Sequence, residues 1–153
     1  MIDQMLDAAQ NGNLQQVQSL LDSGFNPNTA NPHGVTGLLR AVMFNHAEIA
    51  KLLISRGARI TTAHGLPTLL GLAAQKGNME IATLLLAQGA PVDERDNMGV
   101  TALFKAAYSG QLEMAKFLLS KGADRNIKNA YGNTPADAAR DEKHPDIAAL
   151  LNS

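Results

Sequence analysis

The chain has 153 residues, about the length of one domain, with a net charge of −1 and no cysteine. The lack of cysteine excludes disulfides, thiol catalysis and zinc–thiolate sites, and the near-zero charge gives no global basic field to hold nucleic acid. Aromatic residues are only 4% of the chain, so the core must be built from aliphatic side chains. Such a core favours closely packed helices.

The N-terminal sequence M-I-D-Q-M-L-D has no basic segment followed by an apolar run, so it does not read as a secretory signal. No apolar run approaches the roughly 18 residues of a membrane span. We therefore expect a cytoplasmic protein without a membrane contact.

A glycine that follows a leucine-rich segment recurs along the whole chain. The four glycines are 33, 32 and 33 residues apart: Gly24, Gly57, Gly89 and Gly122. This period predicts a repeat architecture in one domain over 1–153. The repeats are 1–30, 31–62, 63–95, 96–128 and 129–153, and the first and last are incomplete.

Each repeat begins with a predicted helix that a short polar side chain caps. The expected caps are Asp3, Thr36, Thr68, Thr101 and Thr134. This first helix should end at a residue that tolerates a left-handed backbone. These residues are Gly12, Asn45, Gly77 and Gly110. Lys143 takes their place in the last repeat, so a less regular turn is expected there.

A second helix follows in each repeat, with an acid in its first turn that suits the helix dipole. The acids are Glu48, Glu80, Glu113 and Asp146. Apolar residues at helical spacing then predict a buried stripe. In the three inner repeats it comprises Ile49, Leu52 and Leu53, then Ile81, Leu84 and Leu85, then Met114, Phe117 and Leu118.

Pairs of small residues on the first helices should let neighbouring repeats approach closely, so that the core runs through the whole stack. The pairs are Ala8–Ala9, Ala41–Val42, Ala73–Ala74, Ala106–Ala107 and Ala138–Ala139. Gln16 and Ser19 stand where inner repeats have Ile49 and Leu52, as expected of an end repeat with a polar outer face. We therefore expect a complete, closed stack.

These segments resemble the ankyrin repeat over essentially the whole chain. The fourth repeat reads D-N-M-G-V-T-A-L-F-K-A-A, then L-E-M-A-K-F-L-L-S-K-G-A-D-R-N, and the fifth keeps G-N-T-P-A-D-A-A. The resemblance implies an all-α solenoid of helix–turn–helix units joined by hairpin-like loops. One departure is that the first helix lacks the family's histidine. Its position holds Leu39, Gly71, Phe104 and Asp137.

The resemblance also implies a concave face, lined by first helices and hairpin tips, on which partners of this family are usually held. We therefore expect a non-catalytic protein–protein interaction module. Exposed apolar groups in a groove mark binding sites, tyrosine is frequent in hot spots and methionine adapts to its partner. The expected patch comprises Met43, Phe44, Lys76, Met98, Tyr108 and Ser109, with His33, Arg59 and His64. In the last repeat the variable positions include Tyr131, Asn133, Asp141 and Glu142. A packing role for Met43 and Phe44 remains open.

The hairpin from Gly57 to Thr68 is one residue shorter than the others, with 11 positions instead of 12. Gly65 lies three residues before its threonine, whereas the other hairpin glycines lie two before theirs. We expect altered tip geometry and fewer backbone hydrogen bonds. Either the deletion is tolerated drift, or Arg59, His64 and Gly65 reshape the groove for a particular partner.

No pattern of catalytic or metal-binding residues is present. The four histidines have no i, i+4 pair on a helix, and neither G-x-S-x-G nor a phosphate loop occurs. We expect no enzyme activity, no cofactor and no metal. Without a basic stripe interleaved with aromatics, we also expect no nucleic-acid binding.

Three alternatives remain: a regulatory or neutralising subunit that inhibits one target, a self-associating structural protein, and an enzyme whose site the sequence does not reveal. A monomer is expected. The charge is uneven, since residues 31–62 carry +3 and residues 129–153 carry −2. This asymmetry either steers an acidic partner toward the middle or reflects a mixed, solvated surface.

Overall fold

The computed structural model describes residues 1–153 as ten α-helices joined by turns and loops. The chain divides into two compact parts, which are described separately: the N-terminal part, residues 1–63, and the C-terminal part, residues 64–153. The all-α architecture predicted from the repeat pattern is confirmed. The expectation of a single domain over 1–153 stays a prediction.

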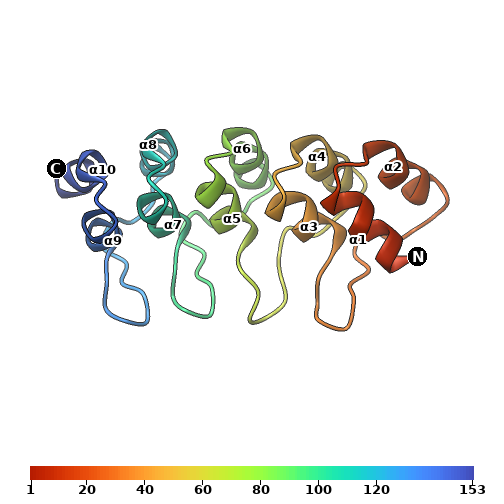
Figure 1. Ribbon diagram of the computed structural model, residues 1–153, viewed down its shortest axis with the longest axis horizontal. Helices are drawn as coiled ribbons and strands as arrows, with labels where there is room; N and C mark the ends of the chain where they lie inside the picture. The colour runs from red at the N-terminus through yellow and green to blue at the C-terminus, as the bar shows by residue number, and fades with distance from the viewer. The chain divides into compact units, whose positions relative to one another are not determined.

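The N-terminal part contains two helix pairs. In chain order the helices are α1 (Ile2–Gln10), α2 (Leu14–Asp22), α3 (Gly37–Met43) and α4 (Ala47–Ser55). The first helices α1 and α3 pack on each other, and so do the second helices α2 and α4. These helices therefore form two layers, and the loop of residues 23–36 projects from the first-helix layer (Figure 1).

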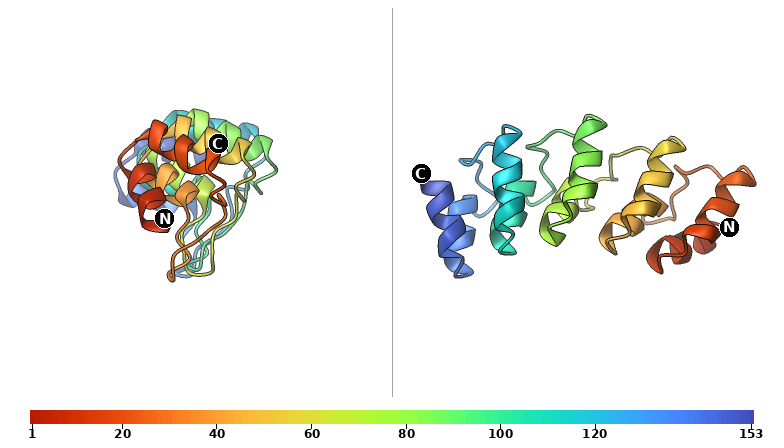
Figure 2. Two further views of the ribbon diagram at one scale, coloured as in Figure 1. Left: turned by 90° about the vertical axis from the view of Figure 1, so that its right-hand side faces the viewer. Right: turned by 90° about the horizontal axis from the view of Figure 1, so that it is seen from above.

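The C-terminal part repeats this arrangement with three pairs. Its helices are α5 (Leu69–Lys76), α6 (Met79–Ala87), α7 (Ala102–Tyr108), α8 (Leu112–Ser120), α9 (Pro135–Asp141) and α10 (Pro145–Asn152). Helix α7 packs against both α5 and α9. The loops of residues 88–101 and 121–134 project side by side from the first-helix layer, as both Figure 1 and Figure 2 show.

The threonine caps are confirmed in all four repeats that have them. Each hydroxyl oxygen accepts a hydrogen bond from the backbone N–H three residues later, at 3.0 to 3.3 Å. The expected Asp3 cap is wrong, because α1 already begins at Ile2 with Met1 as its N-cap. No proline or glycine before Asp3 stops the helix from extending to the chain start. The Asp3 carboxylate instead lies in the first turn, where it suits the helix dipole.

The left-handed turns between paired helices are confirmed, and they include the one expected to differ. Gly12, Asn45, Gly77 and Gly110 have φ angles of 74°, 68°, 67° and 72°. Lys143 adopts the same conformation with φ of 62°, so the predicted irregular turn is wrong. The reason is that the turn closes with the same backbone bond as elsewhere: His144 N–H donates to Ala139 O at 2.7 Å, as His46 N–H does to Ala41 O at 2.8 Å.

The core follows the predicted pattern with two corrections. The small pairs of the first four repeats are buried, but the second position of the last repeat is Arg140, and Ala138 lies one residue before the pair. Arg140 is exposed because no later helix of the chain covers this side of α9. In each stripe the outer two residues are buried. The middle residues Leu52, Leu84 and Phe117 are half-buried. Gln16 and Ser19 are exposed, as predicted.

Candidate functional site

The C-terminal ends of the first helices present large side chains next to the left-handed turns. Phe44 caps α3 and keeps 42% of its surface exposed, while Tyr108 ends α7 and is 51% exposed. Met43, one residue before Phe44, is half-buried. The turn sets this pattern, because its helix end cannot be covered by further residues of the same helix. These ends therefore offer aromatic surface to a ligand.

The tips of three loops are held by one repeated device. The side-chain oxygens of Asn31, Asp96 and Asn129 each accept two backbone N–H groups, two and four residues later, at 2.9 to 3.0 Å. Asparagine therefore replaces the aspartate without loss of the turn, since an amide oxygen accepts equally well. The tip side chains are left free to face solvent.

Two neighbouring loop tips in the C-terminal part are joined directly. Ala130 N–H donates to Met98 O at 2.8 Å, and the Arg95 guanidinium donates to Lys128 O at 3.3 Å. Met98 is 37% exposed and Tyr131, next to the joining bond, is 75% exposed. The two tips thus form one braced surface with a sulfur and an aromatic ring on it.

A hollow of about 210 Å³ lies between α7 and α9. The first-helix residues that line it are Phe104, Tyr108, Ala138, Asp141 and Glu142, and the loop residues are Asn129 and Asn133. Tyr108, a residue of the predicted patch, is thus brought together with the acids of the following repeat. The hollow combines an aromatic wall with two carboxylates and two amides, and contains no basic side chain.

The neighbouring charges leave these carboxylates uncompensated. Arg140 is engaged by Asp137, with Nη2 and Oδ1 at 2.6 Å. Asp137 also accepts from the backbone N–H of Thr134 at 2.8 Å. This bond, with the Thr134 hydroxyl and Arg140, lowers the pKa of Asp137. Because Arg140 is occupied, Asp141 and Glu142 are the charges that face a ligand here.

The other predicted patch residues lie as follows. Lys76 is the last residue of α5 and is exposed, and Ser109 caps α7 and is half-buried. His33 and His64 are exposed in loop turns. Arg59 lies at a loop base, where its backbone N–H donates to Asn28 Oδ1 at 2.7 Å. Gly65 has φ of 87°, the left-handed conformation of the other tip glycines. The predicted loss of backbone bonds over residues 57–68 stays a prediction.

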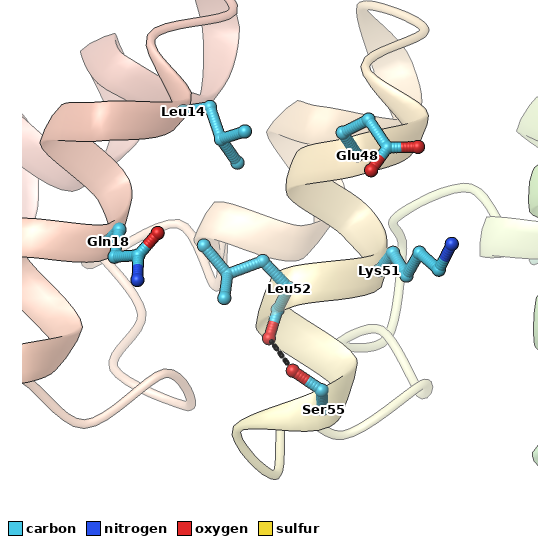
Figure 3. A pocket seen from close by; sticks show the side chains of 6 residues that line it. All are labelled: Leu14, Gln18, Glu48, Lys51, Leu52 and Ser55. Atoms are coloured by element: carbon cyan, nitrogen blue, oxygen red, sulfur yellow. Dashed lines mark hydrogen bonds between the residues drawn. The ribbon is translucent and has the colours of Figure 1, made fainter.

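A second hollow, of about 340 Å³, lies between the second helices α2 and α4 (Figure 3). Leu14, Gln18 and Leu52 point into the space between these helices, whereas Lys51 points away from Leu14 (Figure 3). Glu48 and Ser55 complete the lining. One acid and one base on a mixed lining favour no single ligand chemistry.

The chain has no group of three or more histidine, aspartate or glutamate side chains that could hold a metal ion. None of its helices is long and apolar enough to cross a membrane.

Sequence reasoning selected Tyr108 but missed the hollow beside it. Asp141 and Glu142 were noted only as variable positions, and Phe104 and Ala138 were not connected with binding. The signal that was available is Ala138 itself. It is a small residue at a position where other repeats have a longer side chain, such as Arg40 and Lys105.

Comparison with known proteins gives a consistent family. The model of ankyrin repeats (3 copies) matches residues 5–96 and again 70–153. Glycerophosphocholine phosphodiesterase gde1 of Schizosaccharomyces pombe is 40% identical over 92 residues, which are 59% of this chain and 8% of that protein. A Caenorhabditis elegans homolog of transient receptor potential cation channel subfamily A member 1 is 34% identical over 95 residues, 62% of this chain and 8% of that protein. Cyclin-dependent kinase inhibitor 2A of Monodelphis domestica is 33% identical over 101 residues, 63% of this chain and 57% of that protein.

Proposed function

The chain belongs to the ankyrin-repeat family, whose members are generally protein–protein interaction modules, and from this premise we propose that it binds a protein partner through its first-helix ends and loop tips. Within each part these elements form the proposed binding face. The proposal includes the predicted patch: Met43, Phe44, Lys76, Met98, Tyr108, Ser109, His33, Arg59 and His64.

One observation carries the proposal. Seven large hydrophobic side chains are exposed in the chain, and four of them belong to first-helix ends or loop tips: Phe44, Met98, Tyr108 and Tyr131. Aromatic groups and methionine are the residue types that dominate binding energy in interfaces. Scattered surface leucines need no such explanation. The concentration of these residue types on one kind of element supports binding there.

The test is capture of partners from native cell extract, followed by mass spectrometry, with wild type and the double variant Phe44→Ala, Tyr108→Ala. We expect the variant to lose the captured protein, with affinity at least about tenfold weaker, because hot-spot truncations cost roughly 2 kcal/mol or more. The matched control is Leu14→Ala, Met79→Ala. Those two residues are 40% and 37% exposed but lie on second helices. Circular dichroism checks the folding of both variants.

Unchanged binding by the Phe44/Tyr108 variant, or equal loss in the Leu14/Met79 control, would contradict this choice of face. The enzyme alternative gains nothing from the phosphodiesterase relative, since the match covers only 8% of that protein. The monomeric state, the cytoplasmic location and the absence of nucleic-acid binding stay predictions.

A regulatory role is the second candidate, and one observation favours it. A relative that matches 63% of this chain is named as an inhibitor of a cyclin-dependent kinase. We infer from this that inhibition of a partner enzyme is within reach of such a chain. Assay of the captured partner's activity with and without the purified chain separates inhibition from simple binding.

A further inference from the structure

The fourth residue after the capping threonine differs between repeats in a way that explains the hollow beside Tyr108. This position is Arg40 in α3, Leu72 in α5, Lys105 in α7 and Ala138 in α9. Only in α9 is the side chain short. Ala138 lines the hollow between α7 and α9, so the missing side chain accounts for the space.

In the N-terminal part the chain fills the corresponding place with its own arginine. Arg40 Nη1 donates to Gln10 Oε1 at 2.8 Å, and Gln10 ends α1 just as Tyr108 ends α7. A guanidinium therefore fits between two successive first helices of this fold. Its Nε is buried without a hydrogen-bond partner, so this internal pairing leaves one donor unsatisfied.

We propose that the hollow between α7 and α9 receives an arginine side chain of a protein partner. The proposal rests on the proposed function and names the chemistry of its partner. Tyr108 supplies an exposed ring beside the space that Ala138 leaves, and Asp141 and Glu142 supply two carboxylates. The partner's guanidinium replaces, in this repeat pair, the one that Arg40 supplies in the first pair.

Charge and shape both select arginine. The lining has two carboxylates and no base, so it is complementary to a cation. A planar guanidinium stacks on an aromatic ring and donates to a carboxylate through a fixed fork of N–H groups, whereas an ammonium is a compact, strongly hydrated charge. The partner segment should therefore carry arginine in preference to lysine at this point.

The test is a nuclear magnetic resonance titration of the isotope-labelled full chain with N-acetyl-arginine amide as the probe. N-acetyl-lysine amide and the neutral isostere N-acetyl-citrulline amide are the comparison probes. We expect backbone shifts at Tyr108, Ala138, Asp141 and Glu142 with the arginine probe, and weaker or no shifts with the others. Added salt should weaken the binding because the carboxylates are exposed.

Two variants make the test specific. Ala138→Arg should abolish the shifts by filling the hollow from within, as Arg40 does in the first pair. The matched control is Ala149→Arg on the second helix α10, where the alanine is exposed and the probe should bind as in wild type. The charge variant Asp141→Asn, Glu142→Gln should weaken binding about tenfold, because two exposed charge pairs are lost.

Equal shifts with citrulline, shifts scattered over the surface, or unchanged binding to Ala138→Arg would overturn the inference. The readout is independent of the proposed function. If the extract partner is lost on Phe44→Ala, Tyr108→Ala while the arginine probe does not bind, the inference fails and the proposed function stands. If the probe binds as described but no protein is captured, the proposed function fails while the arginine site remains.

Discussion

The first and last repeat pairs use the same helices but are tied together by different chemistry. In the N-terminal part, long side chains cross from one repeat to the next. Arg40 and His46 both bind Gln10, through its side-chain and backbone oxygens at 2.8 and 2.9 Å. Arg56 pairs with Asp22 at 2.8 Å. The face between α1 and α3 is therefore partly occupied by the chain's own polar groups.

In the C-terminal part the ties lie away from the first-helix face. Loop residues carry them: Ala130 N–H binds Met98 O at 2.8 Å, and Asp124 N–H binds Asp93 Oδ1 at 3.0 Å. Arg125 holds the C-terminal end through Ser153 O at 2.7 Å. The face between α7 and α9 is thus left open. The comparison teaches that a repeat scaffold can free a binding surface by moving its inter-repeat bonds to the loops.

The largest expected difference between the two parts lies in their helix caps. Thr134→Ala should lower the free energy of unfolding by about 1–2 kcal/mol, and Thr36→Ala by about 0.5–1 kcal/mol. The reason is that Thr134 belongs to a capping box with Asp137, whereas Leu39 at the same place in α3 has no polar group to return the bond. Urea unfolding of both variants measures this, and equal losses would contradict the ranking.

The same capping box predicts a pH dependence. The backbone N–H of Thr134, first among its partners, lowers the pKa of Asp137 below the ordinary value of 3.8. A carboxylate whose pKa is lower in the folded state stabilises the fold above its unfolded pKa, and this contribution is lost as the pH falls through the folded pKa. Asp137→Asn should therefore be less stable than wild type at pH 7, and the difference should shrink below about pH 3.8. Unfolding curves at a series of pH values measure it. A difference that persists unchanged into acid would exclude the ionised carboxylate as its cause.

The smallest effect concerns the left-handed turns. Lys143→Gly should raise the free energy of unfolding by about 0.5–1 kcal/mol, since a branched Cβ–backbone clash at φ of 62° is removed. Asn45→Gly in the N-terminal part should gain less, because asparagine tolerates this conformation better than lysine. Thermal and urea unfolding of both variants give the comparison. A loss of stability in Lys143→Gly would show that the lysine side chain has a favourable role that outweighs its strained backbone.

The architecture could be read from local sequence because each repeat writes the same short-range code. A threonine cap, a residue suited to a left-handed turn and an acid in the second helix recur at fixed offsets. Each depends on atoms only a few residues away. The failures were also local. Asp3 was placed by analogy with the threonines although nothing before it stops the helix, and Lys143 was judged by its intrinsic preference although a backbone bond holds its turn.

The candidate site could be predicted only in part. Tyr108 was found because a large aromatic at a helix end has a meaning within its own repeat. The hollow next to it depends on two helices whose residues are some thirty positions apart in the sequence. A single repeat does not reveal what its neighbour leaves empty.

By itself, then, the sequence determined the repeat period, the paired helices, the caps and the alanine-rich core, because these follow from backbone hydrogen bonding and helical periodicity. The tertiary structure decided which polar groups are already occupied and which remain available. Arg40 reaches Gln10, Arg140 is held by Asp137, and Ala138 leaves Tyr108, Asp141 and Glu142 around an open space. The physical reason is that long side chains choose partners across repeats, a choice that packing fixes and that no short stretch of sequence records.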